Sequence, residues 1–209
     1  MGSRAALVCP LVLALVAVAP RPAAGQSCLN YATFLGITGN ADTPGEAYEV
    51  ALSANFAYVA DRAGGLQVVN ITSPFGPAVV ASVVPPGIAE GVAVQGNYAY
   101  IAAQNAGLRI VNIANPNAPV LAGGVTLPNA AYAVAVAGNF AYVADTDAGL
   151  KVINIANPAA PVVVGTADTP GIAYAVAVAG SYAYVADAAA GLQVINVTNP
   201  AAPAIVGTA

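Results

Sequence analysis

Apolar residues after residue 41 fall in short runs that are separated by Gly, Pro, Asn and Asp. In the last part of the chain, four runs rich in Ala and β-branched residues follow one another, at 173–179, 182–186, 192–197 and 204–208. Runs of this length between turn residues predict β-strands, and no stretch without Gly or Pro is long enough for a helical repeat. Because apolar residues occupy both alternating positions of these runs, the pattern predicts sheets that are covered on both faces.

The same pattern returns every 42 residues without an insertion. Ala-Tyr-Val-Ala-Asp stands at 57–61, 141–145 and 183–187, and Ala-Tyr-Ile-Ala-Ala stands at 99–103. A fixed period of this length indicates a repeat architecture. The spacing predicts four units of four strands each, at 42–83, 84–125, 126–167 and 168–209. Sheets that are sandwiched between neighbours are typical of a β-propeller, so we predict an all-β fold with one blade per unit.

Two phrases carry a family resemblance, Gly-Asn-Tyr-Ala-Tyr-Ile-Ala at 96–102 and Gly-Leu-Gln-Val-Ile-Asn-Val at 191–197. They resemble the LVIVD repeat family, and the resemblance covers residues 42–209. It implies an extracytoplasmic β-propeller and little about chemistry. The family motif closes the third strand with Asp, so no role of that carboxylate is carried over to the residues found here, Asn70, Asn112, Asn154 and Asn196.

The ends of the repeat region bear on whether the ring of blades is complete. Residues 34–41 align with the fourth-strand segments at 160–167 and 202–209, which makes five candidate fourth strands for four sets of the other three. We therefore expect an incomplete ring from a larger propeller. The alternative is a four-bladed ring or a self-associating arc, because uncapped repeats expose edges that invite pairing.

The first 25 residues have the anatomy of a secretory signal peptide, with Arg4 before an apolar run at 5–19 and small residues at 23–25. A membrane anchor is the alternative, but crossing a bilayer takes about 20 apolar residues. We therefore predict an extracytoplasmic protein that is secreted, periplasmic or on the cell surface, with no transmembrane span in the mature chain. An N-terminal segment, 26–41, precedes the repeats. It contains Cys28, which we predict to be an unpaired thiol or to pair outside this sequence.

Composition narrows the chemistry further. The hydrophobic fraction of 58% comes mainly from Ala and Val, which favours tightly packed sheets of small residues. Beyond residue 25, nine acidic residues face only Arg62, Arg109 and Lys151, a net charge of −6 that disfavours a nucleic-acid partner. The chain has no His, so the usual general base and the commonest metal ligand are missing. Arg109 and Lys151 share a third-strand position with Gln67 and Gln193, which we interpret as a solvated edge.

The acidic residues fall in two kinds of connection. Asp42, Glu46, Glu49, Glu90 and Asp168 lie in or just after unit entries, and Asp61, Asp145, Asp147 and Asp187 lie between second and third strands. In an up-and-down blade both connections open on one face, which we call the loop face. The candidate ligand- or cation-binding residues are Asp42, Glu46, Asp61, Glu90, Asp145, Asp147, Asp168 and Asp187. Turn capping is the alternative for each. Calcium is the candidate ion, with Asp145 and Asp147 as its densest oxygen ligands. No other cofactor is expected.

These observations favour an exported, non-catalytic interaction module that presents the loop face to a protein, a glycan or a small ligand. The alternative is a fragment of a propeller enzyme whose active site spans missing blades and uses carboxylates such as Asp145 and Asp147. Residues that recur once per unit are predicted to pack between blades. They are the alanines Ala57, Ala99, Ala141 and Ala183 and the tyrosines Tyr58, Tyr100, Tyr142 and Tyr184.

Overall fold

A computed structural model describes residues 39–209; the predicted signal peptide, Cys28 and most of the candidate strand at 34–41 lie outside the described residues. Sheet 1 contains β1 (Glu49–Ser53), β2 (Phe56–Ala60), β3 (Leu66–Asn70) and β4 (Ala78–Val83). Sheet 2 contains β5 (Gly91–Gln95), β6 (Tyr98–Ala102), β7 (Leu108–Asn112) and β8 (Val120–Val125). Sheet 3 contains β9 (Ala133–Ala137), β10 (Phe140–Ala144), β11 (Leu150–Asn154) and β12 (Val162–Ala167). Sheet 4 contains β13 (Ala175–Ala179), β14 (Tyr182–Ala186), β15 (Leu192–Asn196) and β16 (Ala204–Thr208), with a short 3-10 helix, η2 (Ala188–Ala190), between β14 and β15.

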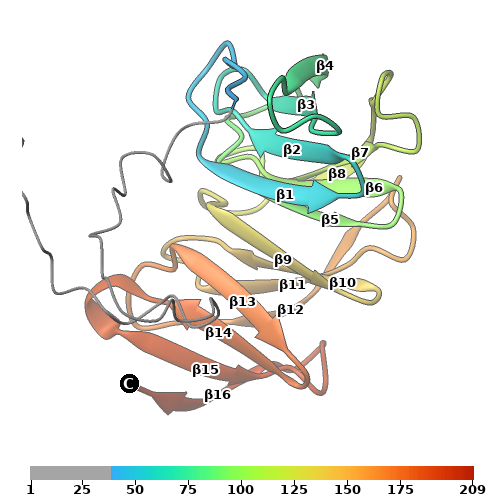
Figure 1. The fold of residues 1–209 in the computed structure, drawn as a ribbon. Coiled ribbons are helices and arrows are strands. Elements are labelled where there is room, and N and C mark those ends of the chain that lie inside the picture. Colours follow the sequence, from blue (N-terminus) through green and yellow to red (C-terminus); the bar gives the residue numbers. More distant parts are fainter. Residues whose placement is uncertain (1–38) are drawn as a thin grey trace, which may run out of the picture. The chain divides into compact units, whose positions relative to one another are not determined.

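Each sheet is an antiparallel meander in which the strands pair in chain order (Figure 1). The fourth strand of every sheet carries a bulge at the same place, opposite Val68–Val69 in sheet 1 and opposite Val194–Ile195 in sheet 4. Bulges twist an edge strand and so discourage edge-to-edge pairing. The four repeats thus share one register, and the predicted all-β architecture of four four-stranded sheets is confirmed.

The first strands β1, β5, β9 and β13 lie side by side in chain order (Figure 1). Between neighbouring sheets the buried residues form three apolar clusters, each built from two sheets. Ala99, Ala141 and Ala183 are completely buried in these clusters. The repeated tyrosines of the first three sheets, Tyr58, Tyr100 and Tyr142, are buried there too. The prediction that small side chains allow close sheet-to-sheet packing is therefore confirmed.

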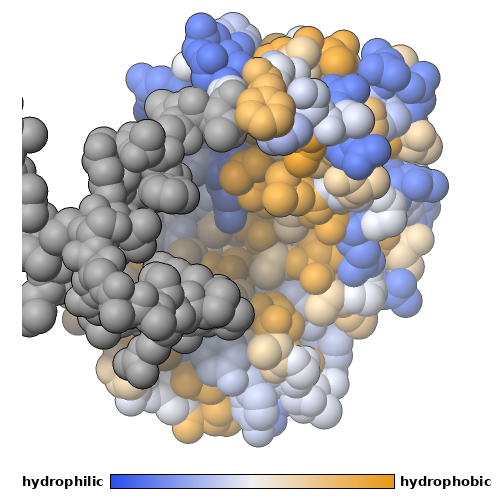
Figure 2. All heavy atoms as spheres, viewed as in Figure 1, coloured by the Kyte–Doolittle hydropathy of each residue, from blue (hydrophilic) through white to orange (hydrophobic). Residues whose placement is uncertain are grey.

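The ring is not closed within residues 39–209, because β13 does not pack against β1 as each first strand packs against the next. Apolar side chains consequently reach the surface at β1, where Val50 and Leu52 are exposed. Figure 2 shows hydrophobic residues gathered over β1 and β5 in that view. The described residues include no helix with the length and apolar character that crossing a membrane requires.

Candidate functional site

Entry loops and the connections between second and third strands meet on one face, as the order of the strands requires. We call the contact between two neighbouring sheets a junction, and the segment before the first strand of a sheet its entry loop. At each junction, a residue just after the second strand of one sheet forms an isolated β-bridge with a residue in the entry loop of the next sheet. The bridges pair Arg62 with Ala89, Gln104 with Ala131, and Thr146 with Ala173. Arg62 donates its N–H to the Ala89 carbonyl at 3.0 Å and accepts the N–H of Ala89 at 3.2 Å. The acidic residues of these loops therefore lie on a shared loop face whose backbone is fixed by the junctions.

Two of the candidate carboxylates hold the entry loop of their own sheet. Asp61 is buried and accepts a hydrogen bond from the Thr43 hydroxyl at 2.5 Å and from the backbone N–H of Gly45 at 2.7 Å. A Cβ on Gly45 would collide with the backbone carbonyl of Asp61, so this close approach requires glycine. Asp187 makes the same pair of contacts with Thr169 and Gly171, at 2.6 and 2.8 Å. Asp61 and Asp187 therefore cap the turn of their own entry loop, which is the alternative to ligand binding for these two residues.

Asp145 occupies the same position in sheet 3, but the two hydrogen bonds that Asp61 and Asp187 accept are not formed there. Leu127 stands where sheets 1 and 4 have Thr43 and Thr169, and Asn129 stands where both have glycine. The Asp145 side chain is completely buried, and neither of its Oδ atoms has a hydrogen-bond partner in good geometry. Burial raises the pKa of Asp145 from 3.8 to about 6, although Lys151 and the nearby Asn129 N–H both lower it. The entry loop reads Asp-Thr-Pro-Gly at 42–45 and 168–171 but Thr-Leu-Pro-Asn at 126–129. This difference is the sequence signal that Asp145 lacks the hydrogen bonds of Asp61 and Asp187.

Arg62 is the centre of a polar cluster at the junction of sheets 1 and 2. Its Nη1 donates to Glu46 Oε2 at 2.7 Å, its Nε lies 3.3 Å from Glu90 Oε1, and its guanidinium lies 4.9 Å from the centre of the Tyr48 ring. The Gln104 amide also donates to Glu90 Oε1. Glu90 is buried, and its Oε2 has no partner. Sequence reasoning selected Glu46 and Glu90 for their charge but missed Arg62 as the group that joins them.

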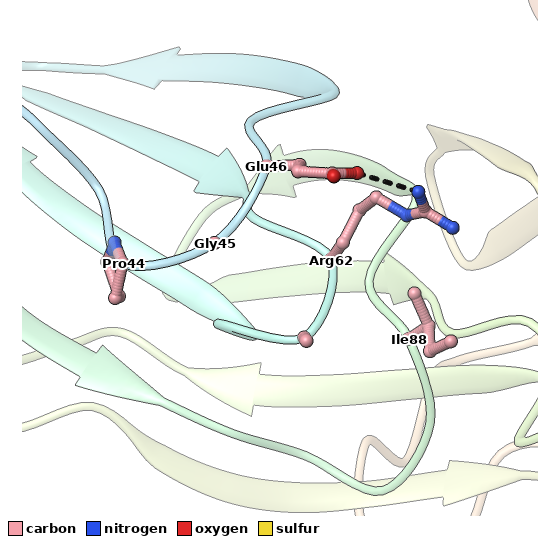
Figure 3. Close-up of a pocket in the computed structure, with 6 residues that line it drawn as sticks. Pro44, Gly45, Glu46, Arg62 and Ile88 are labelled. Atoms are coloured by element: carbon pink, nitrogen blue, oxygen red, sulfur yellow. Dashed lines mark hydrogen bonds and ion pairs between the residues drawn. The ribbon is translucent and has the colours of Figure 1, made fainter.

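A shallow groove runs beside this cluster and is lined by Pro44, Gly45, Glu46, Arg62, Ala63 and Ile88. In Figure 3 the Arg62 side chain reaches toward Glu46, and Ile88 from the next entry loop faces the same groove. The groove therefore lies between the ion-paired guanidinium of Arg62 and the apolar side chain of Ile88.

The remaining candidates, Asp42, Asp147 and Asp168, are exposed on the loop face. Asp145 and Asp147 are thus two residues apart but differ in environment, one buried and the other in solvent. Residues 39–209 hold no cluster of three or more Asp, Glu, His or Cys side chains that could surround a metal ion. Calcium binding by this pair stays a prediction.

A family model for the LVIVD repeat matches the chain four times, at residues 44–84, 86–126, 129–169 and 170–209. The chain belongs to the LVIVD repeat family. Among curated proteins, none matches it.

Two computationally designed proteins of known crystal structure share the fold of these LVIVD repeats. Ika8 is 13% identical, with a TM-score of 0.65 over 81% of this chain and 51% of the Ika8 chain. Ika4 is 12% identical, with a TM-score of 0.60 over 75% of this chain and 96% of the Ika4 chain. This chain therefore spans about half the length of Ika8. At such low identity the likeness shows the fold alone.

The third strand of each LVIVD repeat ends in Asn, and its side chain forms the turn that follows. Asn70 Oδ1 accepts the N–H of Thr72 at 2.9 Å. The equivalent asparagines, Asn112, Asn154 and Asn196, accept the same bond from the residue two positions on. An amide oxygen thus performs the turn capping that an Asp can also perform.

One expectation about the LVIVD third strand was wrong. The position shared by Gln67, Arg109, Lys151 and Gln193 is not a solvated edge: three of its residues are buried and Arg109 is half-buried. Gln67 donates its amide to the Gly64 carbonyl at 2.6 Å, and Gln193 does the same to Ala190 at 2.8 Å. The side chain therefore folds back onto its own loop. At Arg109 burial lowers the pKa of the guanidinium, and its Nε has no partner.

Proposed function

We propose that this LVIVD repeat chain is an exported, non-catalytic interaction module whose loop face binds a basic segment of a partner protein. One observation carries the proposal: the exposed carboxylates of the loop face are not balanced by exposed cations. Asp42, Asp147 and Asp168 are exposed, form no ion pair within residues 39–209 and come from three of the four sheets.

The cations of the described residues are already engaged or withdrawn from solvent. Arg62 is paired with Glu46 and Glu90, and Lys151 is buried. Arg109 is half-buried. The loop face therefore carries a net negative potential that attracts a basic partner and speeds its association.

The spread of these charges favours a partner of protein size over a small ligand or a glycan. The groove beside Arg62 is confined to one junction, and Asp147 and Asp168 do not line it. A non-catalytic role is supported by the absence of His from the whole chain, which removes the usual general base. The exported location is supported by the anatomy of residues 1–25.

Binding of a labelled oligolysine peptide, followed by fluorescence anisotropy at several salt concentrations, tests the proposal. The triple variant Asp42→Asn, Asp147→Asn, Asp168→Asn should weaken binding about tenfold, because each exposed charge contributes roughly 0.5 kcal/mol. The control triple, Asn55→Ser, Asn97→Ser, Asn139→Ser, changes the turns between first and second strands at the opposite end of the strands. Serine already stands at the equivalent Ser181, so this control should bind like the parent.

Binding that is independent of salt, or an equal loss in both triples, would rule out the loop face as a site for basic segments. Neutral oligosaccharides serve as a second probe and should produce no competition. Competition by them, with oligolysine ineffective, would assign the loop face to glycans instead.

A further inference from the structure

The three junctions between neighbouring sheets are built from repeat-equivalent residues. In the first junction, sheet 1 contributes a face that we call the forward face, made of Tyr58, Ala60, Leu66 and Val68. Sheet 2 contributes its backward face, which includes Val92, Ala99, Ile101, Val111 and Ile113. The other two junctions use the same positions displaced by 42 and 84 residues. Each sheet therefore carries two different faces that are complementary to each other.

Two of these faces have no neighbour within the described residues. On the forward face of sheet 4, Leu192 is 40% exposed, whereas its equivalents Leu66, Leu108 and Leu150 are completely buried. On the backward face of sheet 1, Val50 is 56% exposed, whereas its equivalent Val92 is buried. The side chains that would seal a fourth junction are thus present but uncovered.

The backbone conformation at the end of sheet 4 also matches that at the three existing junctions. Arg62, Gln104 and Thr146 bridge to the next sheet from a left-handed conformation, with φ of 45°, 42° and 40°. Ala188, their equivalent in sheet 4, has the same conformation, with φ of 46°, although it forms no such bridge within the described residues. Its repeat-equivalent partner is Ala47, which is exposed in sheet 1.

We propose that sheet 4 of one copy docks on sheet 1 of a second copy of this chain, head to tail, and reproduces the junction that already occurs three times within the chain. Leu192, Tyr184 and Val194 of one copy then cover Val50, Val59 and Ile71 of the other. Ala188 and Ala47 exchange the backbone hydrogen bonds of the bridge.

A second copy of the chain fits the uncovered forward face of sheet 4, because its sheet 1 carries the same backward face that packs against a forward face at each of the three existing junctions. The contact is heterologous, since the two copies contribute different surfaces, and such contacts close into a ring when the rotation allows. This proposal does not depend on the proposed function, because it uses the apolar sheet faces and not the exposed carboxylates.

Sedimentation equilibrium of the purified chain should give twice the monomer mass. Val50→Asp and Leu192→Asp each place a charge in the new junction and should each give monomers. Val120→Asp is the matched control, because Val120 is 57% exposed on the outermost strand β8 and belongs to neither face. Circular dichroism should show that all three variants remain folded, since each side chain is exposed in the single chain.

Mixing the two monomeric variants distinguishes this contact from other kinds of association. Val50→Asp keeps an intact forward face and Leu192→Asp keeps an intact backward face, so an equimolar mixture should form one-to-one dimers. A second measurement uses Ala47→Cys and Ala188→Cys in separate chains that also carry Cys28→Ser. Bridged residues have Cα atoms about 5.5 Å apart, a distance that a disulfide can span, so the mixture should cross-link under mild oxidation.

A monomeric parent chain at all concentrations would overturn the proposal. So would dissociation by Val120→Asp, which would indicate non-specific adhesion. Loss of association with Val50→Asp alone, while Leu192→Asp stays dimeric, would indicate a symmetric contact between two copies of sheet 1. A mixture that neither associates nor cross-links would also exclude the head-to-tail junction.

Discussion

Replacing Asp145 with Asn is expected to stabilise the fold at neutral pH, whereas the same change at Asp61 or Asp187 is expected to destabilise it. All three carboxylates are completely buried at equivalent positions of the repeat. Asp61 and Asp187 each accept two hydrogen bonds, while both oxygens of Asp145 lack a partner. Asn has nearly the same shape as Asp but carries no charge, so the exchange isolates the effect of ionisation.

The magnitude follows from the pKa of Asp145, which burial raises from 3.8 to about 6. Each pKa unit corresponds to about 1.4 kcal/mol, so full ionisation of the folded chain costs about 3 kcal/mol. Because an unpaired amide also carries a desolvation cost, we expect Asp145→Asn to raise the free energy of unfolding by about 1 to 3 kcal/mol at pH 7. For Asp61→Asn or Asp187→Asn, loss of one buried hydrogen bond should lower it by about 1 to 3 kcal/mol.

The dependence on pH has a definite sign. A carboxyl group whose pKa is raised by folding favours the folded state below its unfolded pKa of about 3.8, and this contribution is lost as the pH rises to about 6. The gain from Asp145→Asn should therefore be small at pH 4 and reach its full value near pH 7.

Urea unfolding followed by circular dichroism at pH 4 and pH 7 measures these differences. Comparing variant with parent at each pH cancels contributions from other titrating groups, including Glu49, whose pKa is also raised by burial. If Asp145→Asn leaves the urea midpoint of unfolding at pH 7 unchanged or lowers it, an ionised and unpaired Asp145 does not destabilise the fold. An equal gain at both pH values would show that the charge of Asp145 is not the cause.

Two further predictions concern backbone conformation and packing. Ala54 has a φ of 49° in the turn between β1 and β2, where the other sheets have Gly96, Gly138 and Gly180. Ala54→Gly should therefore raise the free energy of unfolding by about 0.5 to 1 kcal/mol, and Gly96→Ala should lower it by a similar amount. Thermal or urea unfolding measures both changes, and unfolding midpoints equal to that of the parent would argue against strain at Ala54. Ala141 is completely buried between sheets 2 and 3, so Ala141→Leu should destabilise by about 1 to 3 kcal/mol, whereas Ala201→Leu at an exposed turn should leave the unfolding midpoint unchanged. A midpoint that is unaffected by Ala141→Leu would mean that the junction can open to admit the larger side chain.

The repeat and its punctuation determined most of the fold. The 42-residue period, the four apolar runs per unit and the apolar residues on both strand faces predicted four-stranded sheets packed against each other, which the structure confirms. These features are readable from sequence because each strand and turn depends on residues within one unit. The incomplete ring could likewise be predicted, from the extra fourth-strand segment at 34–41.

Only the tertiary structure decided the environment of individual polar groups. Gln67 and Gln193 looked like edge residues, yet each is buried because its amide reaches a carbonyl of the preceding loop. Asp145 and Asp147 were indistinguishable as acids in one loop, but the fold buries the first and exposes the second. A Cβ on Gly45 or Gly171 would collide with the backbone carbonyl of Asp61 or Asp187, whereas sheet 3 carries Asn129 at this position, and Asp145 differs from the other two in its hydrogen bonding and not in its burial. The contacts of Asp61 join residues 16 to 18 positions apart, so the acid and its entry loop have to be compared together across the repeats before the difference at Asp145 can be seen.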